Sequence, residues 1–187
     1  MMSKTGFIGI LYVHVFKSCA EGPVVKLTSY TNYALRSLQL AALNAPQLVR
    51  IDDVVQIHGL AKPHVRKVIH TLGRAELLIT HRGRSGGFQL AKPANMIVVG
   101  DVVRLTEGPL DVVECFNAKT NTCPLIGVCK LSRAMQQAAD AFMAVLDDLT
   151  IADIASNKAQ LLNRIAPLYP LEQLDHGNPP DYNEKSV

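Results

Sequence analysis

The sequence predicts a mainly α-helical protein, a winged helix-turn-helix with a two-stranded wing followed by a long dimerisation helix. Three observations carry this prediction. Two short amphipathic segments meet at Gly59, and the second of them is basic on its polar face. A glycine-rich turn separates two short apolar segments between residues 77 and 91. A long helical pattern with an apolar seam begins at residue 131.

Composition limits the kind of protein. The chain has 187 residues, of which 48% are hydrophobic, so one compact domain with a small appendage is expected. The formal net charge is +3, but residues 58–92 contain seven Lys or Arg against Glu76 alone, which leaves that window at +6 and the rest at −3. Such asymmetry indicates a polyanionic partner, with DNA or RNA as the obvious candidates. No apolar run is long enough to span a membrane.

The first 24 residues do not fit this domain. A mostly apolar run over residues 7–16 is reminiscent of a secretory or lipoprotein signal, but the charged Lys17 makes a poor cleavage site. The codons of residues 21 and 22 resemble a ribosome-binding site, and Val25 could be read from an alternative start. We therefore expect residues 1–24 to be a mis-assigned upstream start or an unstructured leader.

Helical spacing of apolar residues begins near residue 28. Thr28 can cap a helix that runs to Ala45, and a short second helix is expected over residues 51–57. Gly59 supplies a turn after it. Pro63 suits the first turn of a third helix, because the N–H that it lacks would be unpaired there.

The third helix has an apolar face and a basic face. Its apolar positions fall at i, i+3, i+4 and i+7, namely Val65, Val68, Ile69 and Leu72. The opposite face carries Lys62, Arg66, Lys67, His70 and Arg74. Two short helices joined by a glycine turn, the second of them basic, are typical of a DNA-binding helix-turn-helix. The alternative is an ordinary solvated basic face.

Two short strands are expected next, over residues 77–81 and 88–91. The residues between them read Arg82-Gly83-Arg84-Ser85-Gly86-Gly87, which allows a tight hairpin with both arginines at its tip. A basic hairpin after a recognition helix is typical of a wing that reaches phosphates or a minor groove. A phosphate-binding loop is not expected, because a strand rather than a helix follows.

Helical patterns continue on both sides of one loop. A helix is expected over residues 97–107, ending at Gly108. After residue 130, apolar residues recur in alternating steps of four and three, at Leu131, Met135, Ala138, Phe142, Val145 and Leu149. This seam predicts two such helices packed side by side in a homodimer, and the alternative is one amphipathic helix lying on its own domain. A last helix over 151–165 and a flexible tail over 166–187 complete the chain.

Cys115, Cys123 and Cys129 stand in the loop between the two helical regions. Thiolates bind soft or borderline metals, and a short loop brings three of them together at small entropic cost. Structural zinc prefers four ligands in close pairs, and disulfides belong mainly to oxidising compartments. An iron–sulfur cluster would use all three thiolates and leave one coordination site open, whereas a bare thiol switch needs only two. Both of these remain open at this point.

Four stretches, at residues 26–34, 82–87, 100–103 and 123–129, resemble the Rrf2 family of bacterial winged-helix iron–sulfur transcription regulators. The resemblance runs from about Val25 to Ile154. It divides the chain into a winged-helix DNA-binding domain, a connecting helix with a cluster-binding loop, and a dimerisation helix with a final helix, at residues 25–95, 96–129 and 130–165.

The resemblance implies a cytoplasmic homodimer that binds double-stranded promoter DNA, as a repressor, according to the state of a [2Fe-2S] or [4Fe-4S] cluster. The implied cluster ligands are Cys115, Cys123 and Cys129. Asn32 of the partner subunit stands where relatives supply an acidic fourth ligand, and its neutral amide is a weaker one. The expected DNA contacts are Lys62, His64, Arg66, Lys67, His70, Arg82, Arg84 and Ser85.

Within the family, the chain is similar to the nitric-oxide-sensing repressors and next to the iron-responsive regulators. Ser132 occupies a position where another branch has a histidine ligand, which argues against that branch. A regulator that responds to iron or to thiol oxidation is the alternative. A cluster carrier or electron-transfer protein is a weaker one, because it would need neither the basic helix nor the wing. No catalytic triad, carboxylate pair or nucleotide loop indicates an enzyme.

Overall fold

The computed structural model describes residues 26–83 and 85–174, without the side chains of residues 172 and 173. The predicted leader, residues 1–24, therefore lies outside the described residues. In chain order the elements are α2 (Ser29–Asn44), α3 (Ile51–His58), α4 (Lys62–Arg74), β1 (Leu78–His81), β2 (Gly87–Leu90), η1 (Ala94–Met96), α5 (Val99–Glu107), η2 (Glu114–Phe116), α6 (Lys130–Asp147), α7 (Ile151–Ile154), α8 (Lys158–Ile165) and η3 (Leu171–Leu174).

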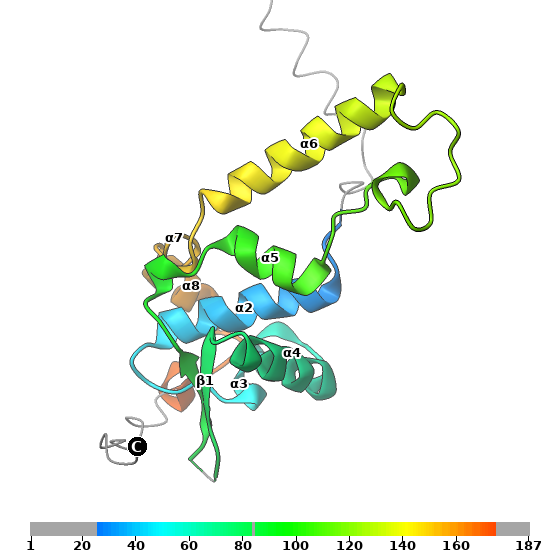
Figure 1. The fold of residues 1–187 in the computed structure, drawn as a ribbon. Helices are drawn as coiled ribbons and strands as arrows, with labels where there is room; N and C mark the ends of the chain where they lie inside the picture. Colours follow the sequence, from blue (N-terminus) through cyan, green and yellow to red (C-terminus); the bar gives the residue numbers. More distant parts are fainter. Residues whose placement is uncertain (1–25, 84, 175–187) are drawn as a thin grey trace, which may run out of the picture.

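Helix α2 runs through the middle of the molecule, with α3, α4 and the hairpin on one side and α5 on the other (Figure 1). Its N-terminus forms as predicted, because the Thr28 side chain accepts a hydrogen bond from the backbone N–H of Thr31. Ala34, Leu38 and Ala41 are at most 1% exposed, so the predicted helical periodicity places them in the core.

The helix-turn-helix prediction is confirmed. Gly59 ends α3 with a φ of +63°, in the left-handed region that glycine enters without steric cost. Pro63 lies in the first turn of α4. The predicted apolar stripe is buried in full, because Val65, Val68, Ile69 and Leu72 are each at most 4% exposed. Burial of this stripe fixes which face of α4 remains in solvent.

The hairpin is an antiparallel pair in which Leu78 lies opposite Leu90 and His81 opposite Gly87. Phe88 also forms an isolated bridge with Val49, through two backbone hydrogen bonds of 2.8 and 2.9 Å, and its side chain is 1% exposed. The wing is therefore anchored on both sides of β2, once to β1 and once to the segment before α3.

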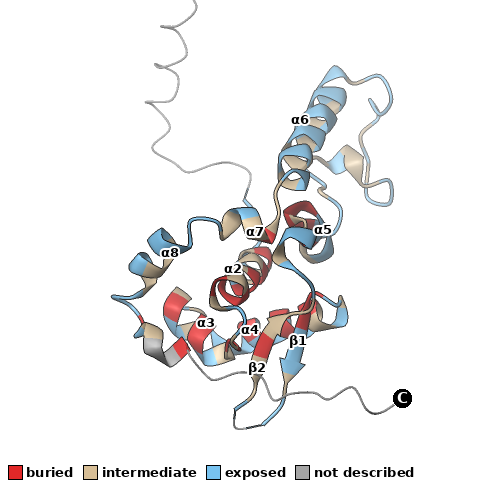
Figure 2. Cartoon of the chain, turned by 90° about the vertical axis from the view of Figure 1, so that its left-hand side faces the viewer, coloured by how far each residue is buried: buried red, intermediate tan, exposed pale blue. Residues whose placement is uncertain are grey.

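Helix α6 stands out from this body. None of its residues is buried, and its main neighbour is α5 (Figure 2). Met143 and Leu146 lie against the core, whereas Leu131 and Val145 are 64% and 63% exposed. The predicted seam is thus apolar and only partly covered by the chain itself.

The structure differs from the prediction after residue 150. The expected helix over 151–165 is two helices, α7 and α8, because the Ser156 hydroxyl donates to the Asp153 carbonyl and the chain turns before Lys158. The tail expected over 166–187 is wrong for residues 166–174, since Tyr169 and Leu174 are buried. Tyr169 and Leu174 belong to the core cluster, and hydrogen bonds join them to Asp53 of α3 and Asn44 of α2. The tail was expected from the composition of residues 166–187 as a whole, whose polar residues lie mostly after residue 174.

Candidate DNA-binding surface and cysteine loop

The free face of α4 is polar and exposed. Lys62, His64, Arg66, Lys67 and His70 all lie in solvent, as the buried stripe on the other side requires. Two of the five have additional contacts. Lys62 forms an ion pair with Asp52 of α3, and the ammonium of Lys67 lies 5.8 Å from the centre of the Tyr30 ring.

Arg66 and Arg74, also exposed on this face, form no ion pair with another described residue. Tyr30 also donates a 2.6 Å hydrogen bond to the Thr71 hydroxyl, which holds its ring beside Lys67. The Lys62–Asp52 pair is exposed and therefore weak, so a phosphate could displace the carboxylate. The exposed side chains of this face are of the kinds that contact a DNA backbone in other proteins.

The wing projects beyond this helix (Figure 1). Arg82 and Ser85 are exposed near its tip, while Arg84 lies outside the described residues. Gly83 has a φ of +109°, and a Cβ at Gly86 would collide with the His81 carbonyl. Both glycines are thus required by the backbone, and they leave the tip to polar and charged side chains.

Cys115, Cys123 and Cys129 are free thiols of intermediate exposure. Two of them meet at Ser132 in the first turn of α6. The Cys115 thiol lies 3.2 Å from the Ser132 hydroxyl, and the Ser132 backbone N–H donates to the Cys129 sulfur at 3.5 Å. The Cys129 sulfur thereby caps α6, so its position depends on the start of that helix.

Cys123 lies in another part of the loop, next to a turn formed by residues 114–122. Its backbone N–H donates to the Asn121 side chain, and the turn is closed by Glu114, whose carboxylate accepts from the backbone N–H and the hydroxyl of Thr122. These hydrogen bonds hold the pKa of Glu114 below its ordinary value. Among the described residues, no three His, Cys, Asp or Glu side chains are close enough to share one metal ion. The structure therefore assembles two of the three predicted sulfur donors.

Asn32 lies in the first turns of α2 and donates to the Thr28 carbonyl at 3.3 Å. The same Thr28 donates through its backbone N–H to Glu107, at the end of α5, over 2.7 Å. The start of α2 is therefore tied to the point where the chain enters the cysteine loop.

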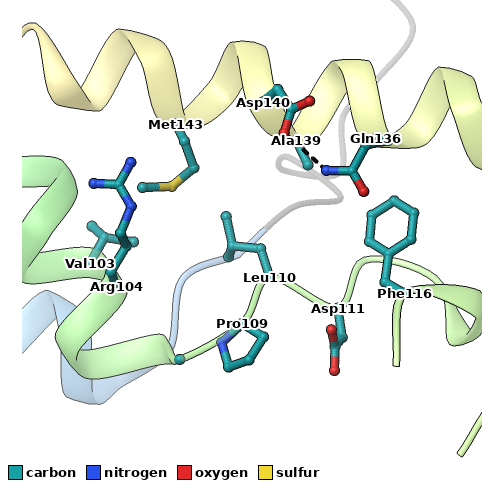
Figure 3. Close-up of a pocket in the computed structure, with 11 residues that line it drawn as sticks. Val103, Arg104, Pro109, Leu110, Asp111, Phe116, Gln136, Ala139, Asp140 and Met143 are labelled. Carbon is teal, nitrogen blue, oxygen red and sulfur yellow. Dashed lines mark hydrogen bonds between the residues drawn. The ribbon is translucent and has the colours of Figure 1, made fainter. Parts of the chain in front are cut away.

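A cavity of about 600 Å³ separates α5 from α6 beside the loop (Figure 3). Leu110 points into it from the loop, and Met143 and Gln136 line it from α6. Arg104 borders it and forms an ion pair with Asp147. Sequence reasoning did not identify Arg104, because an i-to-i+43 contact leaves no periodic signal in the chain.

Taken together, the recognition helix, the wing and the separate long helix define a winged-helix DNA-binding protein. The family model described as "Iron-dependent Transcriptional regulator", Rrf2, matches residues 27–157. The chain belongs to the Rrf2 family of transcriptional regulators, which are not enzymes.

Curated relatives are similar over most of their length. The HTH-type transcriptional regulator NsrR of Bacillus licheniformis is 42% identical over 135 residues, 72% of this chain and 94% of that protein. NsrR of Geobacillus kaustophilus is 43% identical over 138 residues, with coverage of 73% and 94%. Protein aau3 of Rhizobium meliloti is 39% identical over 137 residues, with coverage of 73% and 89%.

Solved structures agree on the fold. CymR, the global cysteine regulator of B. subtilis, aligns with a TM-score of 0.59 at 24% identity, covering 71% of this chain and 97% of its own. IscR of T. potens aligns with a TM-score of 0.58 at 20% identity, covering 74% and 91%. None of the described helices has the combined length and apolar character of a membrane span.

Proposed function

We propose that the chain is a cytoplasmic, homodimeric repressor that senses nitric oxide through an iron–sulfur cluster held by Cys115, Cys123 and Cys129. The observation that carries the proposal is the meeting of Cys115 and Cys129 at Ser132, in a chain about 40% identical to the NsrR proteins. Free, half-exposed thiols suit a centre that a small molecule must reach.

The donor set fits such a cluster chemically. Three thiolates on one loop are the ligands that iron–sulfur clusters use, and no disulfide joins them among the described residues. Because Cys123 stands apart from the other two cysteines, its part of the loop must move toward Ser132 for all three sulfurs to share a centre. The cluster would supply iron that reacts with nitric oxide, and the chain converts that reaction into a change of shape.

The route from loop to DNA surface runs through residues of this chain. Closure of the loop fixes the position of Cys129, which caps α6, and α6 packs on α5. The end of α5 contacts Thr28 at the start of α2, and α2 packs on the recognition helix α4. A loosened loop thus changes the position of the cysteine end of α6 relative to the winged-helix domain.

The exposed apolar positions of α6 support a homodimer. A helix with Leu131 and Val145 in solvent and a heptad-like seam is suited to a second copy of itself. Two copies would present two recognition helices and two wings to a palindromic site, with affinity that falls as salt rises. The expected contacts are the α4 residues already named together with Arg82, Arg84 and Ser85.

The test is an anaerobic titration of the cluster-loaded chain with nitric oxide while DNA binding is followed by fluorescence anisotropy. We expect a coloured dimer that releases its promoter fragment as nitric oxide is added. Cys123→Ala should lose the colour and the response but remain a folded dimer. Cys19→Ala is the matched control, because that cysteine lies outside the loop. A Cys123→Ala protein with a full cluster and a normal response would refute the assignment.

A regulator that responds to iron is the second candidate, and the family description "Iron-dependent" favours it. An iron chelator would then release DNA from the cluster-loaded protein in the absence of nitric oxide. Asn32→Asp tests the fourth position in the same assay. If Asn32 of the partner subunit contributes, a carboxylate there should slow cluster loss to the chelator.

A further inference from the structure

The segment after residue 157 lies beyond the family match and packs back on the DNA-binding domain (Figure 2). Tyr169 is 4% exposed and donates a 2.7 Å hydrogen bond to Asp53 of α3. The Asn44 side chain donates to the Leu174 carbonyl at 2.9 Å, and Leu174 is 3% exposed. These contacts hold the segment after α8 against α2 and α3.

A cavity of about 190 Å³ lies along this seam. Its apolar wall comes from both sides, with Leu40 and Ile57 from the domain and Leu161 and Leu168 from α8 and the turn after it. Leu168 is 68% exposed at the rim. The volume is below the roughly 300–1,000 Å³ of sites for drug-sized ligands, so a nucleotide is too large and a short apolar chain is suitable.

The polar side chains of this cavity are basic. Arg36, His58 and Arg164 line it together with Gln39, and no acidic residue among those that the structure describes does so. Neither arginine forms an ion pair within the described part of the chain. Two unpaired guanidinium groups around one apolar space repel each other, and an anion would relieve that repulsion.

His58 shows the cost of this arrangement. Its Nε2 is buried and has no hydrogen-bond partner among the described residues. Burial and the nearby Arg36 guanidinium lower the pKa of His58 to about 4. The ring is therefore neutral at pH 7, and its unsatisfied nitrogen is a polar group that folding alone does not use.

We propose that the seam between α8 and the α2–α3 face is a binding site for a small apolar anion, a monocarboxylate with a short hydrocarbon chain. The carboxylate lies between Arg36 and Arg164, where two guanidinium groups can donate charge-assisted hydrogen bonds. The hydrocarbon chain covers Leu161 and Leu168. Such a ligand joins the C-terminal segment to the first helix of the helix-turn-helix, apart from the cysteine loop.

The test uses octanoate as the probe and the full chain. Isothermal titration should show binding of octanoate that is at least roughly tenfold tighter than binding of octanol, which has the same hydrocarbon chain without the charge. Arg36→Gln and Arg164→Gln should each weaken octanoate binding by roughly tenfold. Arg133→Gln, at an exposed position on α6, is the matched control and should bind as the parent does.

The location is tested in the same samples. Octanoate should shift the His58 ring signals in NMR spectra and raise the pKa of His58 from about 4, because the bound carboxylate favours the imidazolium. Thermal melts verify that each variant is folded. Equal binding of octanol and octanoate, an equal loss in Arg133→Gln, or unmoved His58 signals would overturn the proposal.

Discussion

Arg104 and Asp147 form a two-point ion pair, with Nη1 2.7 Å from Oδ1 and Nη2 2.6 Å from Oδ2. The pair joins α5 to the C-terminal end of α6, and Asp101 contacts the same guanidinium at 3.2 Å. Beneath it, the connection from α6 to α7 pairs with the segment before α5 through hydrogen bonds of 2.8 and 2.9 Å. The end of α6 nearest the domain is therefore fixed, and the end nearest the cysteines is free to respond.

Asp147→Asn should uncouple the cysteine loop from DNA binding while leaving the fold intact. The pair is exposed to solvent, so its contribution to stability is small, but a bidentate geometry fixes orientation. We expect an unchanged melting temperature and cluster content with a reduced nitric oxide response in the anisotropy assay. Asp148→Asn removes the neighbouring carboxylate and is the control. An unaltered response in Asp147→Asn would exclude this route.

The same pair predicts a pH dependence. The hydrogen bond from Arg104 lowers the pKa of Asp147 in the folded chain. A carboxylate with a depressed folded pKa contributes stability that is present above its unfolded pKa and is lost as pH falls through the folded value. The α5–α6 contact should therefore loosen only in acid, below the unfolded aspartate pKa. Hydrogen exchange of the α5 amides at decreasing pH, compared with Asp147→Asn, measures this loss.

Gly100→Ala should disturb the contact between Arg104 and Asp147 by adding a methyl group on α5. A Cβ at Gly100 would collide with the Asp147 carboxylate and lie 3.2 Å from Arg104 Nη1. Alanine favours the helix by up to about 1 kcal/mol, which offsets the loss of an exposed ion pair, so stability in urea should change little. The nitric oxide response should fall. In an Asp147→Ala background the substitution should have no further effect on the response, and an independent effect there would contradict this explanation.

His58 predicts that stability decreases in mild acid. Its pKa is lowered to about 4 in the folded chain from an ordinary value of 6.5. The unfolded chain binds the extra proton between these values, so the contribution is complete above about pH 6.5 and is lost as pH falls toward 4. After allowance for partial solvent screening we expect a loss on the order of 1 kcal/mol. Urea unfolding at pH 7 and pH 5 measures it, and His58→Phe should abolish this part of the change.

Tyr169→Phe should show whether the C-terminal segment supports the DNA-binding domain. The Tyr169 hydroxyl donates to the buried carboxylate of Asp53, and its removal leaves that oxygen without this donor. The expected cost is about 1–3 kcal/mol in the free energy of unfolding. Tyr33→Phe, a partly exposed tyrosine on α2, is the control. An equal cost in both variants would mean that the Asp53 contact is not responsible.

Ser132→His should convert the cysteine loop toward a four-ligand site. Ser132 contacts both Cys115 and Cys129, so an imidazole at this position lies within reach of the same centre. We expect the loaded variant to lose its cluster several-fold more slowly to a chelator and to react more slowly with nitric oxide. Ser132→Ala separates the loss of the hydroxyl from the gain of a ligand. Equal rates in Ser132→His and the parent would contradict the expected reach.

Local pattern was sufficient for the winged helix. The α4 stripe from Val65 to Leu72, the turn at Gly59 and the cap at Thr28 all follow from neighbours within a few residues, and the structure confirms each. The predicted metal ligands and DNA contacts remain predictions, because they concern groups that one chain does not contain. The spacing of residues in the sequence nonetheless predicted that the DNA-contact residues lie on an exposed face and that the three cysteines lie on one loop.

The sequence by itself determined the elements up to residue 150, the basic face and the family. Only the tertiary structure decided which distant side chains meet: Arg104 with Asp147, Tyr169 with Asp53, and Cys115 and Cys129 with Ser132. It also turned the expected tail over 166–174 into a packed segment. The physical reason is the separation in sequence between the residues that interact. Helix and turn signals come from residues a few positions apart, whereas burial and ion pairing depend on the closure of long loops, which no short window of sequence contains.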